Sequence, residues 1–367
     1  MKQRIPDIEL YNMSRYRGEL MGAAMLFIIL FHVDLNRWNP FFGLHRTGNV
    51  GVDMFLFLSG IGLWYSWTKK KKKAEAPAEG SANAETAETP QKAGWHDVWS
   101  FYLRRFIRIY PAWLIVAGLY YIPNFHGNWL SLIGELAFNI NFWRYGELAF
   151  WYIPAIMALY LIAPFYMMLI ERHPMYRWIP LITIIWCIMV EWVLPLHTAV
   201  NHLEIFWSRV PIFLIGINFG KYVKGKHTID GQALWMLITM WLLTFGTCLY
   251  LEQIRHNDFP LFVERMLYIP FTVMTIMLLN RIFRRTPRWF NTFFAFVGTV
   301  SLEAYLLHIH FVLCYVKLYH LGYWLTFVVT VVITLPLAWL LHKFTNGIIP
   351  GSSSTKKAAI SISESPK

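Results

Sequence analysis

Three ionisable side chains occur within apolar stretches of the sequence, where a charge is costly. His32 ends one apolar run, Asp53 lies near the start of another, and Glu303 lies within a third. Intramembrane ionisable residues usually face a cavity or a partner, so these three are candidates for a functional site. A histidine beside a carboxylate is the minimum machinery of a general base. We therefore predict that the three form a catalytic group; the alternative is a polar network that only holds helices together.

A second group of polar residues is basic. In the segment FYLRRFIRIYP, residues 101–111, Arg105 and Arg108 lie one turn apart on one helix face. Two guanidinium groups at this spacing can grip a phosphate, as a nucleotide-bearing donor such as coenzyme A requires. A cationic anchor at the inner end of a membrane helix is the alternative that the same spacing allows.

A third polar group lies in the segment GTVSLEAYLLH, residues 298–308. Ser301, Tyr305 and His308 recur there at helical spacing, so one face of the helix is polar through the membrane. A purely lipid-facing helix would not be built this way, and we predict that this face lines a binding site. The three cysteines lie in apolar runs without CxxC spacing, so we predict neither a disulfide nor a metal site.

The elements that must position these side chains are membrane helices. Of the 367 residues, 56% are hydrophobic and only 15% are charged, which excludes an ordinary soluble domain. A run of about 17 to 25 mostly apolar residues is what a bilayer requires of a helix. We predict an all-α membrane protein, a bundle of about ten transmembrane helices at residues 19–36, 50–67, 107–123, 148–170, 177–195, 205–221, 232–250, 260–281, 290–316 and 321–342.

The distribution of basic residues predicts how this bundle is oriented. With ten helices and the N-terminus inside, 25 of the 33 Lys and Arg residues fall in inside segments and five in outside loops. The positive-inside rule then puts both termini in the cytoplasm. Topology thus accounts for the net charge of +12, which excludes nucleic acid as a partner. By helix rise, His32 and Glu303 lie toward the outer side, whereas Arg105 and Arg108 lie at the cytoplasmic mouth.

Two segments have the composition of disordered chain. Residues 69–94 are a lysine run followed by an Ala/Glu/Pro/Thr tract, and residues 351–367 are a Ser/Lys tail. We therefore predict one membrane domain over residues 1–350. Residues 69–94 would be a disordered cytoplasmic loop inserted between the second and third helices, and residues 351–367 a disordered C-terminal tail.

Five segments of the sequence form a specific combination. They are the apolar run ending Leu30-Phe31-His32, GVDMFLFLSG at 51–60, LRRFIRIYP at 103–111, FWYIPAIMALYLIAP at 150–164 and TVSLEAYLLHIH at 299–310. Together they span about 300 of the 367 residues. In this order they resemble the acyltransferase 3 family of integral membrane acyltransferases, and the pairing of GVDMFLFLSG with LRRFIRIYP is more specific than any single motif.

The resemblance implies a fold, an activity and a location. The family forms a ten-helix bundle and carries acyl groups, commonly acetyl, from a cytoplasmic coenzyme A thioester to hydroxyls of extracytoplasmic glycans. It implies a multi-pass enzyme of the cytoplasmic membrane, with acyl-coenzyme A, commonly acetyl-CoA, as co-substrate and no tightly bound cofactor. Its partners would be the lipid bilayer and a glycan or glycolipid acceptor. His32 would be the catalytic base, with Arg105 and Arg108 holding the donor.

A function from another class fits some of the same residues. A proton-coupled transporter or glycan exporter could use His32, Glu303 and His308 as a proton relay. Ten helices with polar residues near the midplane suit that function too. Two features of the sequence argue against a transporter. It has no evident internal repeat, and it has no pair of helices broken by Gly or Pro at corresponding places in two halves.

One position departs from the family's pattern. The family usually has an arginine eleven residues before the histidine, and here that position is Met21. Arg17 lies four residues earlier, one turn nearer the cytoplasm on the same helix face, where it can substitute for the missing arginine. The residues that we predict to bind the donor or substrate are Arg17, Arg105, Arg108, Ser301, Tyr305 and His308.

Overall fold

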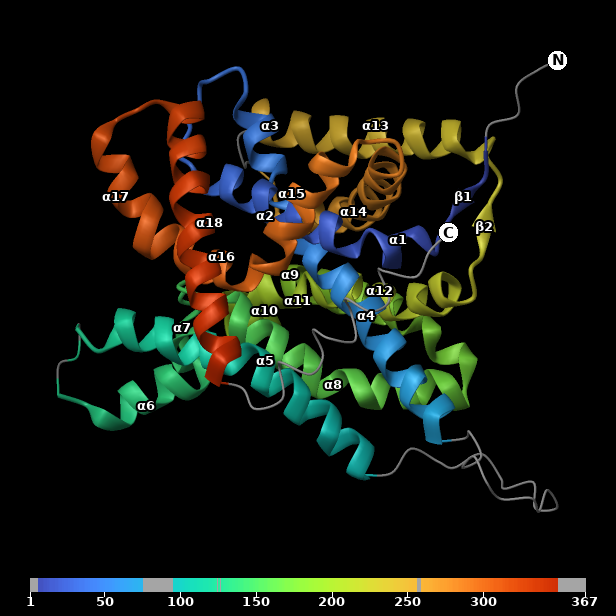
Figure 1. The fold of residues 1–367 in the computed structure, drawn as a ribbon, viewed down its shortest axis with the longest axis horizontal. Helices are drawn as coiled ribbons and strands as arrows, with labels where there is room; N and C mark the ends of the chain where they lie inside the picture. The colour runs from blue at the N-terminus through green and yellow to red at the C-terminus, as the bar shows by residue number, and fades with distance from the viewer. Residues whose placement is uncertain (1–5, 75–94, 124, 126, 256–258, 349–367) are drawn as a thin grey trace.

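The computed structural model describes residues 6–74, 95–123, 125, 127–255 and 259–348 as a helical assembly (Figure 1). Two short strands, β1 (Ile8–Glu9) and β2 (Thr228–Ile229), pair in antiparallel register. The α-helices are α1 (Asn12–Arg15), α2 (Arg17–His32), α3 (Phe42–Thr47), α4 (Val50–Ala74), α5 (Trp95–Tyr121), α6 (Trp129–Phe138), α7 (Ile140–Tyr145), α8 (Tyr152–Arg172), α9 (Ile179–Trp192), α10 (Leu194–Val200), α11 (Glu204–Trp207), α12 (Val210–Lys224), α13 (Ala233–Gln253), α14 (Leu261–Phe283), α15 (Arg288–Thr299), α16 (Ser301–Leu307), α17 (Cys314–Val316) and α18 (Tyr323–Ile348).

Seven helical segments of the described chain are long and apolar enough to cross a membrane, and one bent helix pair would make an eighth. The prediction of a helical, multi-pass membrane protein is thereby confirmed, whereas the number of ten crossing helices stays a prediction. The two predicted spans that do not meet this criterion are α2 and α5. Helix α2 has only 16 residues, and arginines interrupt the apolar part of α5.

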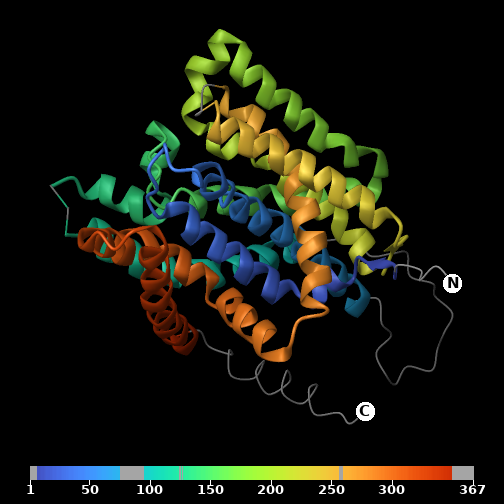
Figure 2. The same ribbon diagram turned by 90° about the horizontal axis from the view of Figure 1, so that it is seen from above.

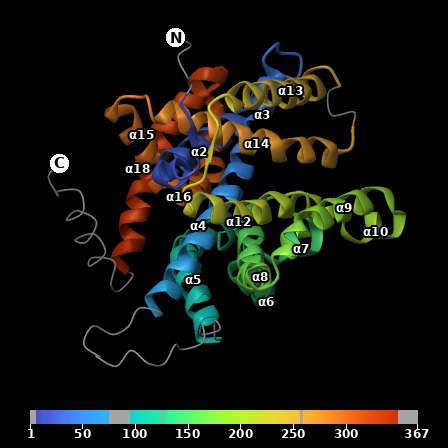
Figure 3. The same cartoon turned by 90° about the vertical axis from the view of Figure 1, so that its right-hand side faces the viewer.

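Helices α2 and α4 lie at the centre of the assembly (Figure 2), where α12, α14, α15, α16 and α18 pack against one or both of them. Helix α2 packs against α15 and α4, and α4 packs against α12. The α4–α12 contact needs glycines: a Cβ at Gly60 would lie 2.5 Å from the carbonyl oxygen of Phe213, and one at Gly216 would lie 2.3 Å from that of Phe57. Small residues permit such close backbone approach in membrane bundles. Helices α13 and α14 lie side by side next to α3 (Figure 3).

The predicted single helix over residues 290–316 is broken in the structure. Helix α15 ends at Thr299, and α16 begins at Ser301 after a turn at Val300. The hydroxyls of Thr299 and Ser301 donate to the backbone carbonyls of Ala295 and Gly298. Such side-chain bonds compete with the helical hydrogen-bond ladder. The prediction of one continuous helix is therefore wrong at this point.

The structure differs from the predicted loop of residues 69–94 at the start of that segment. Helix α4 continues through residues 69–74 and ends at Ala74. Lysine is a good helix former, so a helix that is already nucleated extends through a lysine run. Residues 75–94 of the predicted loop and the predicted tail of 351–367 lie outside the described residues.

Candidate active site

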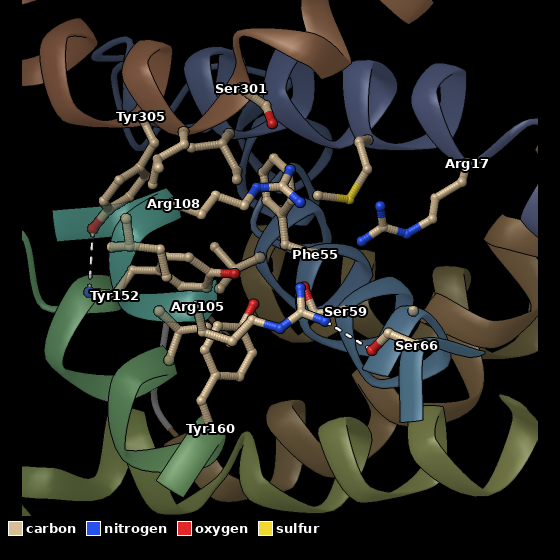
Figure 4. Close-up of a pocket in the computed structure, with 17 residues that line it drawn as sticks. Arg17, Phe55, Ser59, Ser66, Arg105, Arg108, Tyr152, Tyr160, Ser301 and Tyr305 are labelled. Carbon is tan, nitrogen blue, oxygen red and sulfur yellow. Dashed lines mark hydrogen bonds between the residues drawn. The ribbon is translucent and has the colours of Figure 1, made fainter. Parts of the chain in front are cut away.

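A narrow cavity of about 300 Å³ lies between α2, α4, α5, α8 and α16 (Figure 4). One face of α4 lines it, because residues from Val52 to Ser66 recur there at three- and four-residue spacing. This stretch of helix spans about 21 Å, so the cavity is long and thin. We call it the arginine cavity. Its lining residues are Arg17, Met21, Ile28, Val52, Phe55, Ser59, Gly62, Ser66, Arg105, Arg108, Ile109, Tyr152, Ile156, Tyr160, Ser301, Leu302 and Tyr305.

Three guanidinium groups point into the arginine cavity (Figure 4). Arg17 donates from Nε to the carbonyl oxygen of Leu58 at 3.3 Å, and Arg105 donates from Nη2 to Oγ of Ser66 at 2.9 Å. No carboxylate lines this cavity, and none of the three arginines, including Arg108, forms an ion pair within the described part of the chain. Uncompensated positive charge inside a bundle is unfavourable, so the cavity is suited to an anion.

The position of Arg17 depends on a glycine of α4. A Cβ at Gly62 would lie 3.2 Å from Nη2 and 3.3 Å from Cζ of Arg17. Because that is tighter than ordinary van der Waals contact, the missing side chain makes room for the guanidinium group. Met21, one turn further along α2, lines the same cavity. An arginine at position 17 or at position 21 of α2 would therefore reach the same arginine cavity.

Two tyrosines lie at the opposite end of the cavity from Arg17 (Figure 4). The backbone N–H of Tyr152 donates to the hydroxyl oxygen of Tyr305 at 3.2 Å. This bond occupies the oxygen of Tyr305, while no described residue accepts the proton of its hydroxyl. The Tyr305 hydroxyl therefore has a proton to donate to a ligand in the cavity.

His32 and His308 form a pair one helical turn beyond this end. Nε2 of His308 lies 3.2 Å from Nδ1 of His32. Nδ1 of His32 also lies 2.8 Å from the carbonyl oxygen of Ile28, and Nδ1 of His308 lies 2.8 Å from that of Tyr305. Since a carbonyl oxygen only accepts hydrogen bonds, each neutral ring is assigned its proton at Nδ1. Nε2 of His32 then keeps the lone pair that a general base needs.

The histidine pair stands between two cavities. His32 lines a second cavity of about 650 Å³, whereas Ile28, one turn earlier, lines the arginine cavity. On the facing helix, Tyr305 lines the arginine cavity and Ile309 the second one. Between these two residues the chain enters a π-helical turn, His308–Leu313, a conformation frequent at functional sites. The histidine pair therefore lies where the lining residues of one cavity give way to those of the other.

We call the second space the histidine cavity. It is bounded by the segment that follows α2, by α3, and by the chain around α17. Nζ of Lys317 lies 2.7 Å from the carboxylate of Asp34 and ties two of these segments together. Its lining residues are Phe31, His32, Val33, Asp34, Leu35, Phe42, His45, Arg46, Ile309, Leu313, Cys314 and Lys317.

The expected pairing of His32 with Glu303 does not occur in the structure. Glu303 accepts a hydrogen bond from Nδ1 of His342 on α18 at 2.7 Å. Glu303 and His308 are five residues apart and so project from different faces of the helix, one toward α18 and the other toward α2. The imidazole of His308 thus occupies the place expected of a carboxylate. The prediction that a carboxylate orients His32 is wrong for Glu303.

Asp53 is also engaged elsewhere. Its Oδ1 lies 3.7 Å from Nε of Arg209, and this arginine donates to Asn49 and stacks over the ring of Trp151. Both side chains of the Asp53–Arg209 pair are buried. Asp53 comes directly after Val52 on α4 and projects away from the face that lines the arginine cavity. Asp53 therefore joins α4 to Arg209, the residue directly before α12, and no contact of Asp53 with His32 is found in the described chain.

The remaining predicted residues gather in one place. Arg17, Arg105, Arg108, Ser301 and Tyr305 all line the arginine cavity, and His308 contacts His32. Sequence reasoning missed Ser59, Ser66, Tyr152 and Tyr160, although their spacing on α4 and α8 carried the signal. Among the described residues, no three His, Cys, Asp or Glu side chains are placed to hold a metal ion.

Comparison with known proteins identifies a family and no individual relative. A family model described as an acyltransferase domain matches residues 22–343. None of the curated proteins and none of the solved structures matches the chain. The matched range includes both histidines of the pair as well as Arg105 and Arg108, and it begins after Arg17.

Proposed function

The chain belongs to the acyltransferase 3 family of membrane acyltransferases, and from this premise we propose its substrates. The donor is acyl-coenzyme A, with acetyl-CoA as the foremost candidate, taken from the cytoplasm. The acceptor is a hydroxyl of an extracytoplasmic glycan or glycolipid. One observation carries the proposal: Arg17, Arg105 and Arg108 converge in a narrow cavity without a carboxylate.

The shape and charge of the arginine cavity suit coenzyme A. Guanidinium groups bind phosphates through charge-assisted, often bidentate hydrogen bonds. From Arg17 to His32 helix α2 spans about 22 Å, a distance that fits a long pantetheine arm better than a compact substrate. With the phosphates at the arginines, the arm would follow the face of α4. The thioester would then reach the tyrosine end of the cavity.

The reaction would take place beside the histidine pair. Nε2 of His32 removes the proton of the acceptor hydroxyl, whose oxygen attacks the thioester carbon. The C–S bond then breaks, and coenzyme A leaves as a thiolate that takes a proton from the imidazolium. The hydroxyl of Tyr305 donates to the oxyanion that forms on the carbonyl oxygen. His308 holds the ring of His32 in the tautomer that this step requires.

The membrane topology that we propose has ten crossing helices with both termini in the cytoplasm. Helices α2 and α5 complete the count, because an arginine-bearing or short helix is tolerated where other helices surround it. The excess of Lys and Arg in the predicted inside segments supports this orientation. The arginine cavity would then open toward the cytoplasm of a cell whose cytoplasmic membrane holds the protein.

The rival function of a proton-coupled transporter or exporter has less support. A relay through His32, His308 and Glu303 needs these groups in contact. Glu303 instead bonds to His342 on α18. The family membership also favours transfer of an acyl group over transport.

The test compares the surface glycans of cells that express the protein with those of cells that lack it. Mass spectrometry should find an acyl group that disappears without the protein, and isotope-labelled acetyl-CoA should bind to the purified protein. His32→Ala protein should bind the labelled donor but restore no acyl group to the cells. Identical glycans in both cells would contradict the proposed function, as would purified protein that binds no acyl-CoA.

A further inference from the structure

A buried histidine of the histidine cavity lacks hydrogen-bond partners. Only 6% of His45 is exposed, and neither ring nitrogen has a partner among the described residues. Rings of Phe31 and Tyr323 cover it, with centroids 5.9 and 5.6 Å away. The backbone carbonyls of Phe31 and Val33 lie near the imidazole but do not meet hydrogen-bond geometry. Since an unpaired buried polar group is unfavourable, the imidazole of His45 is suited to a hydrogen bond with a ligand hydroxyl in this cavity.

Arg46 presents a free edge of its guanidinium group in the same cavity. Its Nε lies 3.3 Å from each carboxylate oxygen of Glu252, and its Cζ lies 4.9 Å from the ring centre of Phe31. These contacts fix the plane of the guanidinium. Its two terminal nitrogens have no hydrogen-bond partner in the described chain. A fixed guanidinium with two free terminal nitrogens matches a carboxylate or a phosphate bidentately.

The geometry relates Arg46 to His32. Both groups lie against the ring of Phe31: Cζ of Arg46 is 4.9 Å from its centre, and the imidazole of His32 is 5.0 Å from it. Arg46 and His32 also line the same cavity. Lys317 adds a second basic group, and the single acidic lining residue, Asp34, is paired with it. A volume of about 650 Å³ lies within the range of small-molecule sites.

We propose that the histidine cavity is the acceptor site and that it selects a sugar carrying an anionic group. Arg46 binds the carboxylate or phosphate of that sugar, His45 bonds to one of its hydroxyls, and another hydroxyl reaches Nε2 of His32. This inference rests on the proposed function, because it uses His32 as the base. A neutral sugar could bond to His45 but would leave the terminal nitrogens of the partly exposed Arg46 to water.

The experiment uses full-length protein in cells that otherwise lack it. Four forms are compared: wild type, Arg46→Gln, Arg46→Lys, and Arg144→Gln as a control that removes an exposed arginine outside both cavities. Fragment mass spectra of the surface glycans identify the sugar that bears the acyl group, and whether its anionic group is a carboxylate or a phosphate. Binding of labelled acetyl-CoA to each purified form reports on folding and on the donor site.

We expect the acylated sugar to carry a carboxylate or a phosphate. Arg46→Gln should lower its acylation at least about tenfold, in proportion to the loss of a charge-assisted contact. Arg46→Lys should keep part of the acylation, because lysine retains the charge but not the fork. Arg144→Gln should behave as wild type, and all four forms should bind acetyl-CoA equally.

Two results would overturn the inference while leaving the proposed function intact. One is an acylated sugar without an anionic group. The other is full acylation by Arg46→Gln protein. If Arg46→Gln protein fails to bind the donor, two other measurements still test the inference. They are the identity of the sugar that the wild type acylates and the partial activity of Arg46→Lys. A result against the proposed function itself can be distinguished from these two, because the glycans of cells with and without the protein would then be identical.

Discussion

At the scale of single residues, His32 is oriented by another histidine and by its own backbone. An aspartate in that place would stabilise the imidazolium by its charge, whereas a neutral imidazole accepts a hydrogen bond without adding charge. Nδ1 of His308 is held by the carbonyls of Ala304 and Tyr305. His308 can therefore accept from His32 only through Nε2. It is a positioning residue, and the base chemistry belongs to Nε2 of His32.

Replacing the base tests this arrangement. His32→Ala should lower the rate of acyl transfer by about 10² to 10⁴-fold, the usual effect of losing a general base. Binding of acetyl-CoA should be unchanged, because His32 does not line the arginine cavity. Equilibrium binding and single-turnover transfer are measured on the same preparations. His173→Ala, an exposed histidine outside both cavities, serves as the control. Loss of donor binding in His32→Ala would instead favour a structural role for the pair.

The hydroxyl of Tyr305 is the group placed to stabilise an oxyanion. Tyr305→Phe keeps the ring and removes the hydroxyl, both its proton and the oxygen that accepts from the N–H of Tyr152. The rate of transfer should fall about 10²-fold while the affinity for acetyl-CoA stays constant. Tyr315→Phe removes a hydroxyl from an exposed tyrosine and should change neither quantity. An unchanged rate in Tyr305→Phe would exclude the hydroxyl from the reaction.

The role of Arg17 can be separated from that of a general cationic anchor. Arg17→Ala should weaken acetyl-CoA binding about 10- to 100-fold, in line with about 1.5–3 kcal/mol for a hydrogen bond to a charged group. Residual affinity is expected from Arg105 and Arg108. Arg17→Lys should also be impaired, because lysine lacks the guanidinium fork. Adding Met21→Arg to Arg17→Ala should restore part of the affinity, since Met21 lines the same cavity. Wild-type affinity in both single variants would remove Arg17 from the donor site.

At the scale of helices, sequence spacing predicts which face of a helix is functional. It predicts less well which neighbouring helix that face contacts. Arg105 and Arg108 were placed together by their separation, because both lie on one helix. The pairing of His32 with His308 joins residues 276 positions apart in the chain. It depends on how α16 is rotated after the turn at Val300, and helical periodicity carries no information on that rotation. The carboxylate expected beside His32 was misplaced for this reason.

The close approach of α2 and α4 gives a test of the arginine cavity at this scale. Gly62→Leu should displace the guanidinium of Arg17 and weaken acetyl-CoA binding at least about tenfold. Leucine favours a helix more than glycine does, so α4 itself should not be weakened. Gly246→Leu is the matched control, because a Cβ there meets nothing within 4 Å. Equal donor affinity in Gly62→Leu and wild type would show that the space beside Gly62 is not used in binding the donor.

At the scale of the whole molecule, the two cavities lie on either side of one histidine pair. The arginine cavity begins at the start of α2, and the histidine cavity lies past its end. Counting residues along the helices predicted two such polar zones, because rise per residue fixes depth. Their chemistry was predicted for the arginines and for His32, but not for His45 and Arg46. His45 and Arg46 lie in α3, a helix of only six residues, which is too short for a helical period to indicate which side chains face inward.

The orientation of the molecule can be tested with a native thiol. Cys314 is exposed and lines the histidine cavity, whereas Cys187 and Cys248 are buried. If the histidine cavity opens to the outside, a membrane-impermeant maleimide should label Cys314 in intact cells. Cys314→Ser protein should remain unlabelled, which assigns the signal to this thiol.

Permeabilising the cells decides between the two orientations. Labelling should not increase after permeabilisation, because the two buried cysteines stay shielded by packed helices. Labelling of Cys314 only in permeabilised cells would place the histidine cavity in the cytoplasm. That result would require acyl donor and acceptor to exchange sides, since the two cavities lie at opposite ends of α2. Labelling in intact cells instead supports donor entry from the cytoplasm and delivery of the acyl group past His32 to the outer face.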